Sequence, residues 1–72
     1  MISFKMKMRA LEQVSAAGRY GVDIDIGWES ITMLELVQEG RLNEELVSGG
    51  RLRRYTLTEA GRRALGTAEN GG

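Results

Sequence analysis

The sequence predicts a small α+β domain with three helices and a two- or three-stranded antiparallel sheet. Apolar residues recur with helical spacing in two segments, 9–17 and 29–39, and they alternate with acidic residues in 22–26. A Gly49-Gly50 pair separates two further strand-like segments, which is typical of a tight β-hairpin. A third, shorter helical segment follows the hairpin. The predicted order is therefore helix, strand, helix, hairpin, helix.

The first helix is predicted over residues 9–17, and Gly18 closes it because glycine readily adopts the backbone conformation that ends a helix. The preceding segment, 2–8, fits either a strand or a helical stripe that continues through Leu11 and Val14. The sequence leaves both open, and the alternation slightly favours a strand or extended chain. Three apolar side chains of this segment are expected in the core or, alternatively, in a dimer seam: Phe4, Met6 and Met8.

The middle of the chain predicts a short strand followed by a helix. Residues 22–26 alternate aliphatic and acidic side chains, which indicates a strand with one acidic face. The helix is predicted from about residue 29 or 30 to Glu39, and Gly40 ends it. Trp28, just before this helix, is expected to pack in the core. The apolar stripe of the helix consists of Ile31, Leu34 and Val37, widened by Met33 and Leu36.

A hairpin and a capped helix complete the predicted domain. Two central glycines in Ser48–Arg51 satisfy the positive φ angles of a primed hairpin turn. Thr58 is a candidate N-cap for a helix over 59–65 that ends at Gly66, so that residues 1–66 form one domain and 67–72 a flexible tail. A close approach of the backbone to the sheet would explain Gly61 in the first turn. The returning strand places Arg51, Arg53, Tyr55 and Leu57 on one face, with Tyr55 in the core, and Leu52, Arg54, Thr56 and Thr58 on the other.

The residue types restrict the chemistry that the chain can perform. The chain has neither cysteine nor histidine, which removes disulfides, thiolate metal sites and the usual general base. A domain of 72 residues offers little concave volume, so we expect no enzyme, no metal site and no cofactor. It buries only about 60% of its unfolded surface, which makes a homodimer an expectation. No apolar run approaches the roughly 18 residues of a membrane span, and the cytoplasm is the default location.

The formal charge is zero, but the charges are unevenly distributed. Residues 20–40 contain five acidic residues and no basic one, whereas residues 41–66 contain six arginines against three glutamates. Such asymmetry fits either ordinary solvated faces or a binding surface in the basic segment.

The run GGRLRRYTLTEAGRRAL resembles the wing and closing helix of bacterial winged helix–turn–helix regulators of the MarR and PadR kind. In those families a glycine-containing hairpin tip leads into an arginine-and-tyrosine strand, and a Leu-Thr-Glu-x-Gly-Arg sequence opens a helix. The matching positions are Leu57, Thr58, Glu59, Gly61 and Arg62. The helix that ends at Gly40 is similar to the recognition helix of these families. Residues 19–27 leave no room for their separate second helix, which is expected to be missing or reduced to a turn.

The resemblance implies a winged-helix-like fold and double-stranded DNA as the partner of a transcriptional regulator. Guanidinium groups bind phosphate oxygens bidentately, so the arginines of the hairpin are the first candidates for backbone or minor-groove contacts. The alternative for these arginines is edge charge, paired across the strands with Glu44 or Glu45. The predicted DNA-contacting residues are Arg41, Arg51, Arg53 and Arg54, with Gly49 and Gly50 shaping the tip, Arg62 and Arg63 as further backbone contacts, and Thr32 and Gln38 facing base edges.

A second hypothesis makes the domain a protein-interaction module. The middle helix carries acidic residues and no lysine or arginine, so the phosphate backbone would repel it. An acidic helix suits a protein partner better, and an exposed tryptophan beside it would indicate an interface. The residues of this alternative surface are Trp28, Glu29, Glu35 and Glu39.

Overall fold

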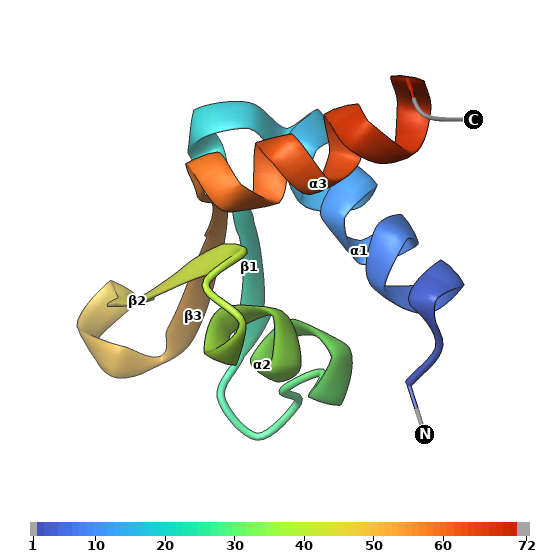
Figure 1. Ribbon diagram of the computed structural model, residues 1–72. Coiled ribbons are helices and arrows are strands. Elements are labelled where there is room, and N and C mark those ends of the chain that lie inside the picture. Colours follow the sequence, from blue (N-terminus) through green and yellow to red (C-terminus); the bar gives the residue numbers. More distant parts are fainter. Residues whose placement is uncertain (1, 71–72) are drawn as a thin grey trace.

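The computed structural model describes residues 2–70, and it describes side chains for residues 2–66. Three helices and a three-stranded antiparallel sheet confirm the predicted α+β class (Figure 1). The expected absence of a helix between the first and middle helices is confirmed, because only a 3-10 turn and a strand lie there. The elements are α1 (Phe4–Ala17), η1 (Gly18–Tyr20), β1 (Val22–Asp25), α2 (Ile31–Gln38), β2 (Leu42–Val47), η2 (Ser48–Gly50), β3 (Leu52–Leu57) and α3 (Glu59–Asn70).

The sheet has the order β1-β3-β2, so the last strand in the chain is the central one. The ladder with β2 covers all of β3, but the ladder with β1 stops at Tyr55. The end of β3 at residues 56–57 therefore has a strand neighbour on one edge only. The pairs that close the two ladders are Val22–Tyr55 and Asp25–Leu52 with β1, and Leu42–Leu57 and Val47–Leu52 with β2.

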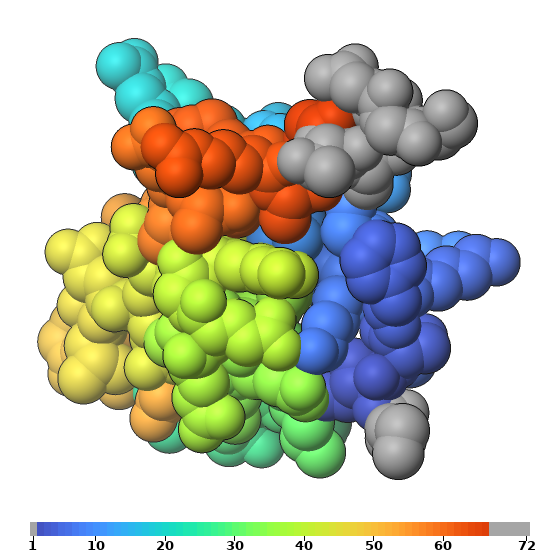
Figure 2. Space-filling model, in the orientation of Figure 1, coloured from blue at the N-terminus to red at the C-terminus, as the bar shows by residue number. Residues whose placement is uncertain are grey.

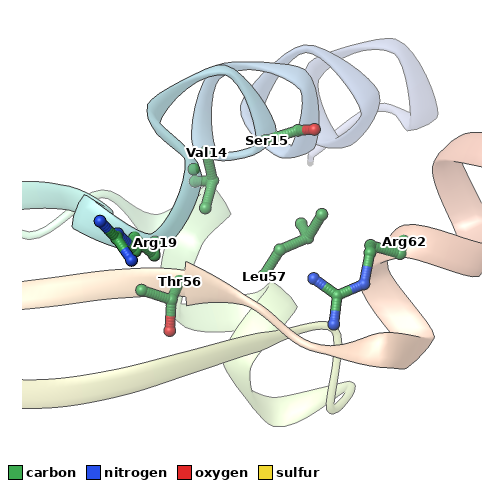
Figure 3. A pocket seen from close by; sticks show the side chains of 7 residues that line it. Val14, Ser15, Arg19, Thr56, Leu57 and Arg62 are labelled. Atoms are coloured by element: carbon green, nitrogen blue, oxygen red, sulfur yellow. The ribbon is translucent and has the colours of Figure 1, made fainter.

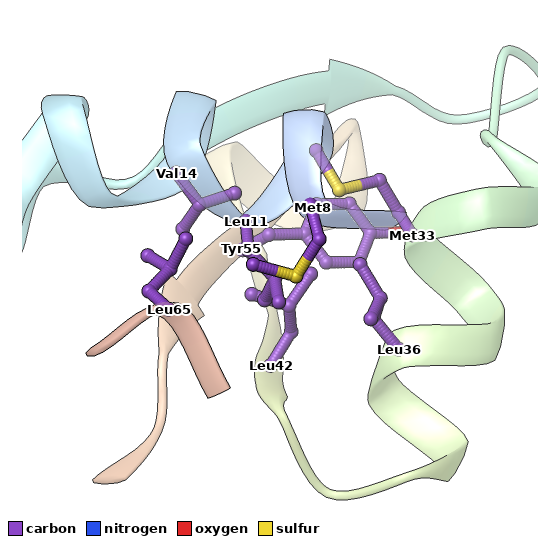
Figure 4. Close-up of a cluster of buried hydrophobic side chains, with 8 residues drawn as sticks. All are labelled: Met8, Leu11, Val14, Met33, Leu36, Leu42, Tyr55 and Leu65. Carbon is purple, nitrogen blue, oxygen red and sulfur yellow. The ribbon is translucent and has the colours of Figure 1, made fainter. Parts of the chain in front are cut away.

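One apolar cluster lies between the helices and the sheet (Figure 4). Tyr55 of the central strand is fully buried within it, which confirms its predicted core position. Every helix and the two longer strands contribute to this cluster, so the elements stabilise one another. Its members are Met8, Leu11, Val14, Met33, Leu36, Leu42, Tyr55 and Leu65.

Helix α1 begins at Phe4, so the preference for a strand over residues 2–8 is wrong. The Ser3 hydroxyl accepts a hydrogen bond from the Met6 N–H (3.1 Å), which satisfies a donor that the first turn leaves free. Met8 lies in the core as predicted, and it forms one helical stripe with Leu11 and Val14. Phe4 and Met6 are exposed, so their expected core positions are wrong. Gly18 ends the helix with a φ of 62°.

Helix α2 also begins at a serine cap, because the Ser30 hydroxyl accepts from the Met33 N–H at 3.3 Å. Its buried residues are Met33 and Leu36. Ile31, which the predicted stripe turned inward, is 72% exposed, so the predicted orientation is wrong at this position. Trp28 is 80% exposed, and its predicted core position is wrong as well.

The hairpin tip has the predicted glycine turn. Gly49 and Gly50 have φ angles of 67° and 86°, and the Arg51 N–H donates to the Ser48 carbonyl at 3.3 Å. Ser48 also has a positive φ, of 54°, so the loop is longer than a two-residue turn and the last paired residues are Val47 and Leu52.

Helix α3 is attached to the turn before β2 through Thr58. The Thr58 hydroxyl accepts from the Gly61 N–H (3.0 Å), as predicted for an N-cap, and it donates to the Gly40 carbonyl (2.7 Å). Gly61 lies directly against the Arg41 carbonyl, which confirms the expected close approach. The helix continues to Asn70, so the helix end predicted at Gly66 is wrong. Residues 71–72 of the predicted tail lie outside the described residues.

Two glycine substitutions in α3 test this contact. We expect Gly61→Ala to destabilise the fold by about 1–3 kcal/mol, because its Cβ would overlap the Arg41 carbonyl and force the backbone apart. Gly66→Ala is the matched control, since nothing lies near its Cβ, and it should stabilise the helix by up to about 1 kcal/mol. Urea unfolding of the three proteins measures both effects. Equal stability of the two variants would contradict the close approach.

Candidate functional site

The hairpin arginines point to opposite faces of the sheet. Arg53 shares its face with buried Tyr55, whereas Arg54 lies on the outer face. They therefore do not form one continuous ridge.

Arg53 is held by two glutamates on the inner face. Its Nη1 lies 3.0 Å from Glu44 Oε1, and its Nε lies 3.7 Å from Glu29 Oε1. The hydrogen bond to Glu44 raises the pKa of Arg53 above its ordinary value. Glu44 also accepts a hydrogen bond from the Tyr55 hydroxyl at 3.0 Å. The half-buried Arg53 guanidinium is thus engaged by carboxylates of its own chain.

Arg54 forms a bidentate ion pair with Asp23 across the β1–β3 ladder. Its Nε and Nη2 lie 2.8 and 3.1 Å from the two carboxylate oxygens. This pairing lowers the pKa of Asp23 and raises that of Arg54. Glu45 lies directly opposite Arg54 on the other neighbouring strand. Both flanking strands therefore present an acid to this arginine.

The remaining predicted cations are also distributed over separate surfaces. Arg63 pairs with Glu59 one turn earlier in α3 (3.1 Å), and Arg41 lies 3.8 Å from Glu39. Arg51 and Arg62 make no ion pair with any side chain that the structure describes. Only Arg51 of this pair belongs to the hairpin, where it follows Gly49 and Gly50.

The hairpin end of the molecule is acidic rather than basic. Five carboxylates lie beside three arginines, which gives this end a formal charge of −2. Taken over both faces of the sheet, this end has no excess of positive charge that would attract a duplex. DNA binding through the hairpin stays a prediction, and the charge distribution does not favour it. The carboxylates are Asp23, Asp25, Glu29, Glu44 and Glu45, and the arginines are Arg51, Arg53 and Arg54.

The two predicted base-reading residues do not share one surface. Thr32 is half-buried and lines a hollow between α2 and α1. Gln38 is exposed and lines a different hollow, beside Ile31 and Leu34.

The four residues of the alternative protein-binding surface have different roles. Glu29 accepts a hydrogen bond from the Gly27 N–H (2.9 Å), which is the main cause of its lowered pKa. Glu35 and Glu39 both hold Lys7 of α1, at 2.9 and 2.6 Å, and their hydrogen bonds raise the pKa of Lys7. By contrast, Trp28 is 80% exposed and lies in the loop that Glu29 fixes.

Trp28 belongs to a group of exposed apolar residues, of which the sequence analysis placed only Trp28 on a candidate interface. Glu29 contacts Arg53, and Arg53 lies directly opposite Leu46, where side chains are about 4.5–5.5 Å apart at Cβ. Leu46, at 62% exposed, is therefore close to the loop that carries Trp28. The available sequence signal was that α2 and β2 contain more apolar residues than one buried face can hold, Ile31 and Leu46 among them. We call this group the apolar patch, and its members are Ile26, Trp28, Ile31 and Leu46.

Two other classes of site are not found in the described part of the chain. No group of three or more acidic residues there could hold a metal ion. Among the described helices, none combines the length and apolarity that crossing a membrane requires.

Comparisons with protein families, curated proteins and solved structures give no match for this chain. The resemblance to the MarR and PadR wing thus depends on the sequence motif alone.

The ion pairs of Arg53 predict a difference between two hairpin arginines. Arg53→Gln should lower the melting temperature, because Glu44 and Glu29 would face each other without a cation. Arg51→Gln is the control, since Arg51 is exposed and makes no ion pair with a described side chain. Thermal unfolding followed by circular dichroism measures both. An equal decrease in the two variants would contradict the network.

The Tyr55 hydroxyl predicts an unusually late phenol titration. Burial and the hydrogen bond to Glu44 raise the pKa of Tyr55 to about 12. Because the folded protein favours the neutral phenol, the resulting stability is complete below pH 10 and is lost as the pH rises towards 12. Tyr20→Phe leaves Tyr55 as the sole tyrosine, so ultraviolet absorbance reports it directly. A midpoint near 10 in the folded variant, checked by circular dichroism, would contradict the buried hydrogen bond.

Proposed function

We propose that the domain is a protein-interaction module, and that its apolar patch binds a basic segment of another protein with apolar anchor residues. The observation that carries the proposal is the exposure of Trp28, the only tryptophan of the chain, beside further exposed apolar side chains. Tryptophan is enriched among the residues that dominate binding energy at protein interfaces. Ile26 and Ile31, two exposed apolar residues within three positions of Trp28, add apolar surface of the kind that marks interaction sites.

The loop that carries Trp28 is pre-organised. The Trp28 N–H donates to the Asp25 carbonyl (3.0 Å), and Gly27 between them has a φ of 97°. Glu29 holds the Gly27 N–H and also contacts Arg53. A loop fixed in this way loses little conformational entropy on binding, which favours affinity.

The charge around the apolar patch indicates the kind of partner. The neighbouring hairpin end carries a net charge of −2, so lysine or arginine residues around an apolar anchor would be attracted. A second copy of the chain would bring the same acidic surface against itself, which disfavours self-association through this face. Duplex DNA would be repelled by the same charges. A basic protein segment is therefore the occupant that fits.

The test uses Trp28 as its own reporter. We expect an amphipathic leucine/lysine peptide to shift the Trp28 fluorescence to shorter wavelength with saturation, and the matched leucine/glutamate peptide to leave it unchanged. Ile31→Ser removes an exposed apolar side chain from the apolar patch and should weaken binding about tenfold. That factor corresponds to a loss of about 1.4 kcal/mol of binding free energy. Melting temperature should not change, since Ile31 is exposed. Tyr20→Ser, which alters an exposed aromatic residue outside the apolar patch, should bind as the unaltered protein does.

Three results would overturn the proposal. The first is equal binding of both peptides, and the second is equal weakening by Ile31→Ser and Tyr20→Ser. The third is a Trp28 shift that depends on protein concentration or on added duplex DNA, which would assign the surface to a second copy or to nucleic acid.

A further inference from the structure

A second surface, away from the apolar patch, gathers positive charge. It is an open groove of about 410 Å³ between the end of α1, strand β3 and the first turn of α3 (Figure 3). No carboxylate lines it. Its size lies in the range of pockets that bind small ligands. The lining residues are Val14, Ser15, Gly18, Arg19, Thr56, Leu57 and Arg62.

Two arginines flank the groove from different elements. Arg19 comes from η1 and Arg62 from α3, and Figure 3 shows them on either side of Thr56 and Leu57. Neither makes an ion pair with a carboxylate whose side chain the structure describes. Two unpaired arginines with no carboxylate in the lining give the groove a local excess of positive charge.

A neutral backbone donor supplements the two guanidinium groups. Ser15 and Thr56 also line the groove, but Figure 3 shows the Thr56 hydroxyl turned away from α1. Strand β1 begins opposite Tyr55, so Leu57 has no strand partner on that edge of β3. The Ile26 N–H donates to the Arg51 carbonyl, which shows that alternate residues from Arg51 onward direct their polar backbone groups towards β1. Leu57 belongs to this series, and its N–H is directed towards the groove.

Arg19 is partly positioned before any ligand arrives. Its guanidinium carbon lies 5.5 Å from the centre of the Tyr20 ring, a distance typical of cation–π contacts. The end of α1 exposes helix carbonyls that would oppose an anion. Arg19 follows this helix end directly, and part of its positive charge offsets the negative potential of these carbonyls. An anion in the groove therefore needs the second positive charge, that of Arg62.

We infer that this groove binds a phosphomonoester group. Guanidinium groups form two parallel hydrogen bonds with phosphate or carboxylate oxygens. Two arginines match the nearly double negative charge of a phosphomonoester, whereas a carboxylate or a phosphodiester would leave one positive charge uncompensated. The Leu57 N–H adds a neutral hydrogen bond to one of the remaining oxygens. The groove shares no residue with the apolar patch, so this inference is independent of the proposed function.

The test is a titration of the isotopically labelled protein with glycerol 3-phosphate, followed by amide chemical shifts at constant ionic strength. We expect saturable shifts centred on Gly18, Arg19 and Leu57, and none of similar size with chloride. Arg62→Gln should weaken binding at least tenfold. Arg63→Gln is the matched control on the next residue, because Arg63 is 77% exposed, pairs with Glu59 and does not line the groove. Its affinity should equal that of the unaltered protein.

Arg19→Gln supplies a second, independent variant from a different element. It should also weaken glycerol 3-phosphate binding at least tenfold, with an unchanged spectrum away from the groove as evidence that the fold is retained. Equal affinity of the Arg62→Gln and Arg63→Gln variants would overturn the site, as would shifts scattered over the whole surface. Tighter binding of a duplex oligonucleotide than of glycerol 3-phosphate, at the same amides, would overturn the assignment to a phosphomonoester.

Discussion

The arrangement of this domain depends on one chain of polar contacts that begins in its core. The fully buried Tyr55 donates its hydroxyl to Glu44, whose other carboxylate oxygen binds Arg53, and Arg53 reaches Glu29 in the loop before α2. A buried phenol needs a hydrogen-bond partner, and a half-buried guanidinium needs a counter-charge. These contacts give the phenol its hydrogen-bond partner and the guanidinium its counter-charge, with residues from three separate segments. They also join the hairpin to the loop that presents Trp28.

The same contacts explain how a chain of zero net charge has two different ends. Pairing with Glu44, Glu29 and Asp23 neutralises Arg53 and Arg54, and further carboxylates leave the hairpin end acidic. The balancing positive charge lies on α1, η1 and α3, where Arg19 and Arg62 face a groove without acids. The apolar patch and the groove therefore suit partners of opposite charge. Total charge alone would have concealed this separation.

Features governed by local backbone chemistry could be predicted from the sequence, and features governed by distant contacts could not. The glycine turn and the Thr58 cap of the Gly61 N–H each follow from a few neighbouring residues. The pairing of Arg54 with Asp23 joins residues 31 positions apart and depends on the β1–β3 register. The start of α1 is an intermediate case, because its Ser3 cap is a local signal that the strand-like alternation obscured.

The motif that resembles a regulator's wing is largely explained by its structural roles. Leu57 packs against the core, Thr58 caps α3 and anchors it to Gly40, and Gly61 lets α3 approach the Arg41 carbonyl. Each of these residues is needed to join a hairpin to a helix at short distance, whatever the domain binds. The motif therefore reports how the chain folds and carries little information about DNA. Arg62 is the exception: it has no described ion-pair partner and lines the groove, where we propose that it binds a phosphomonoester.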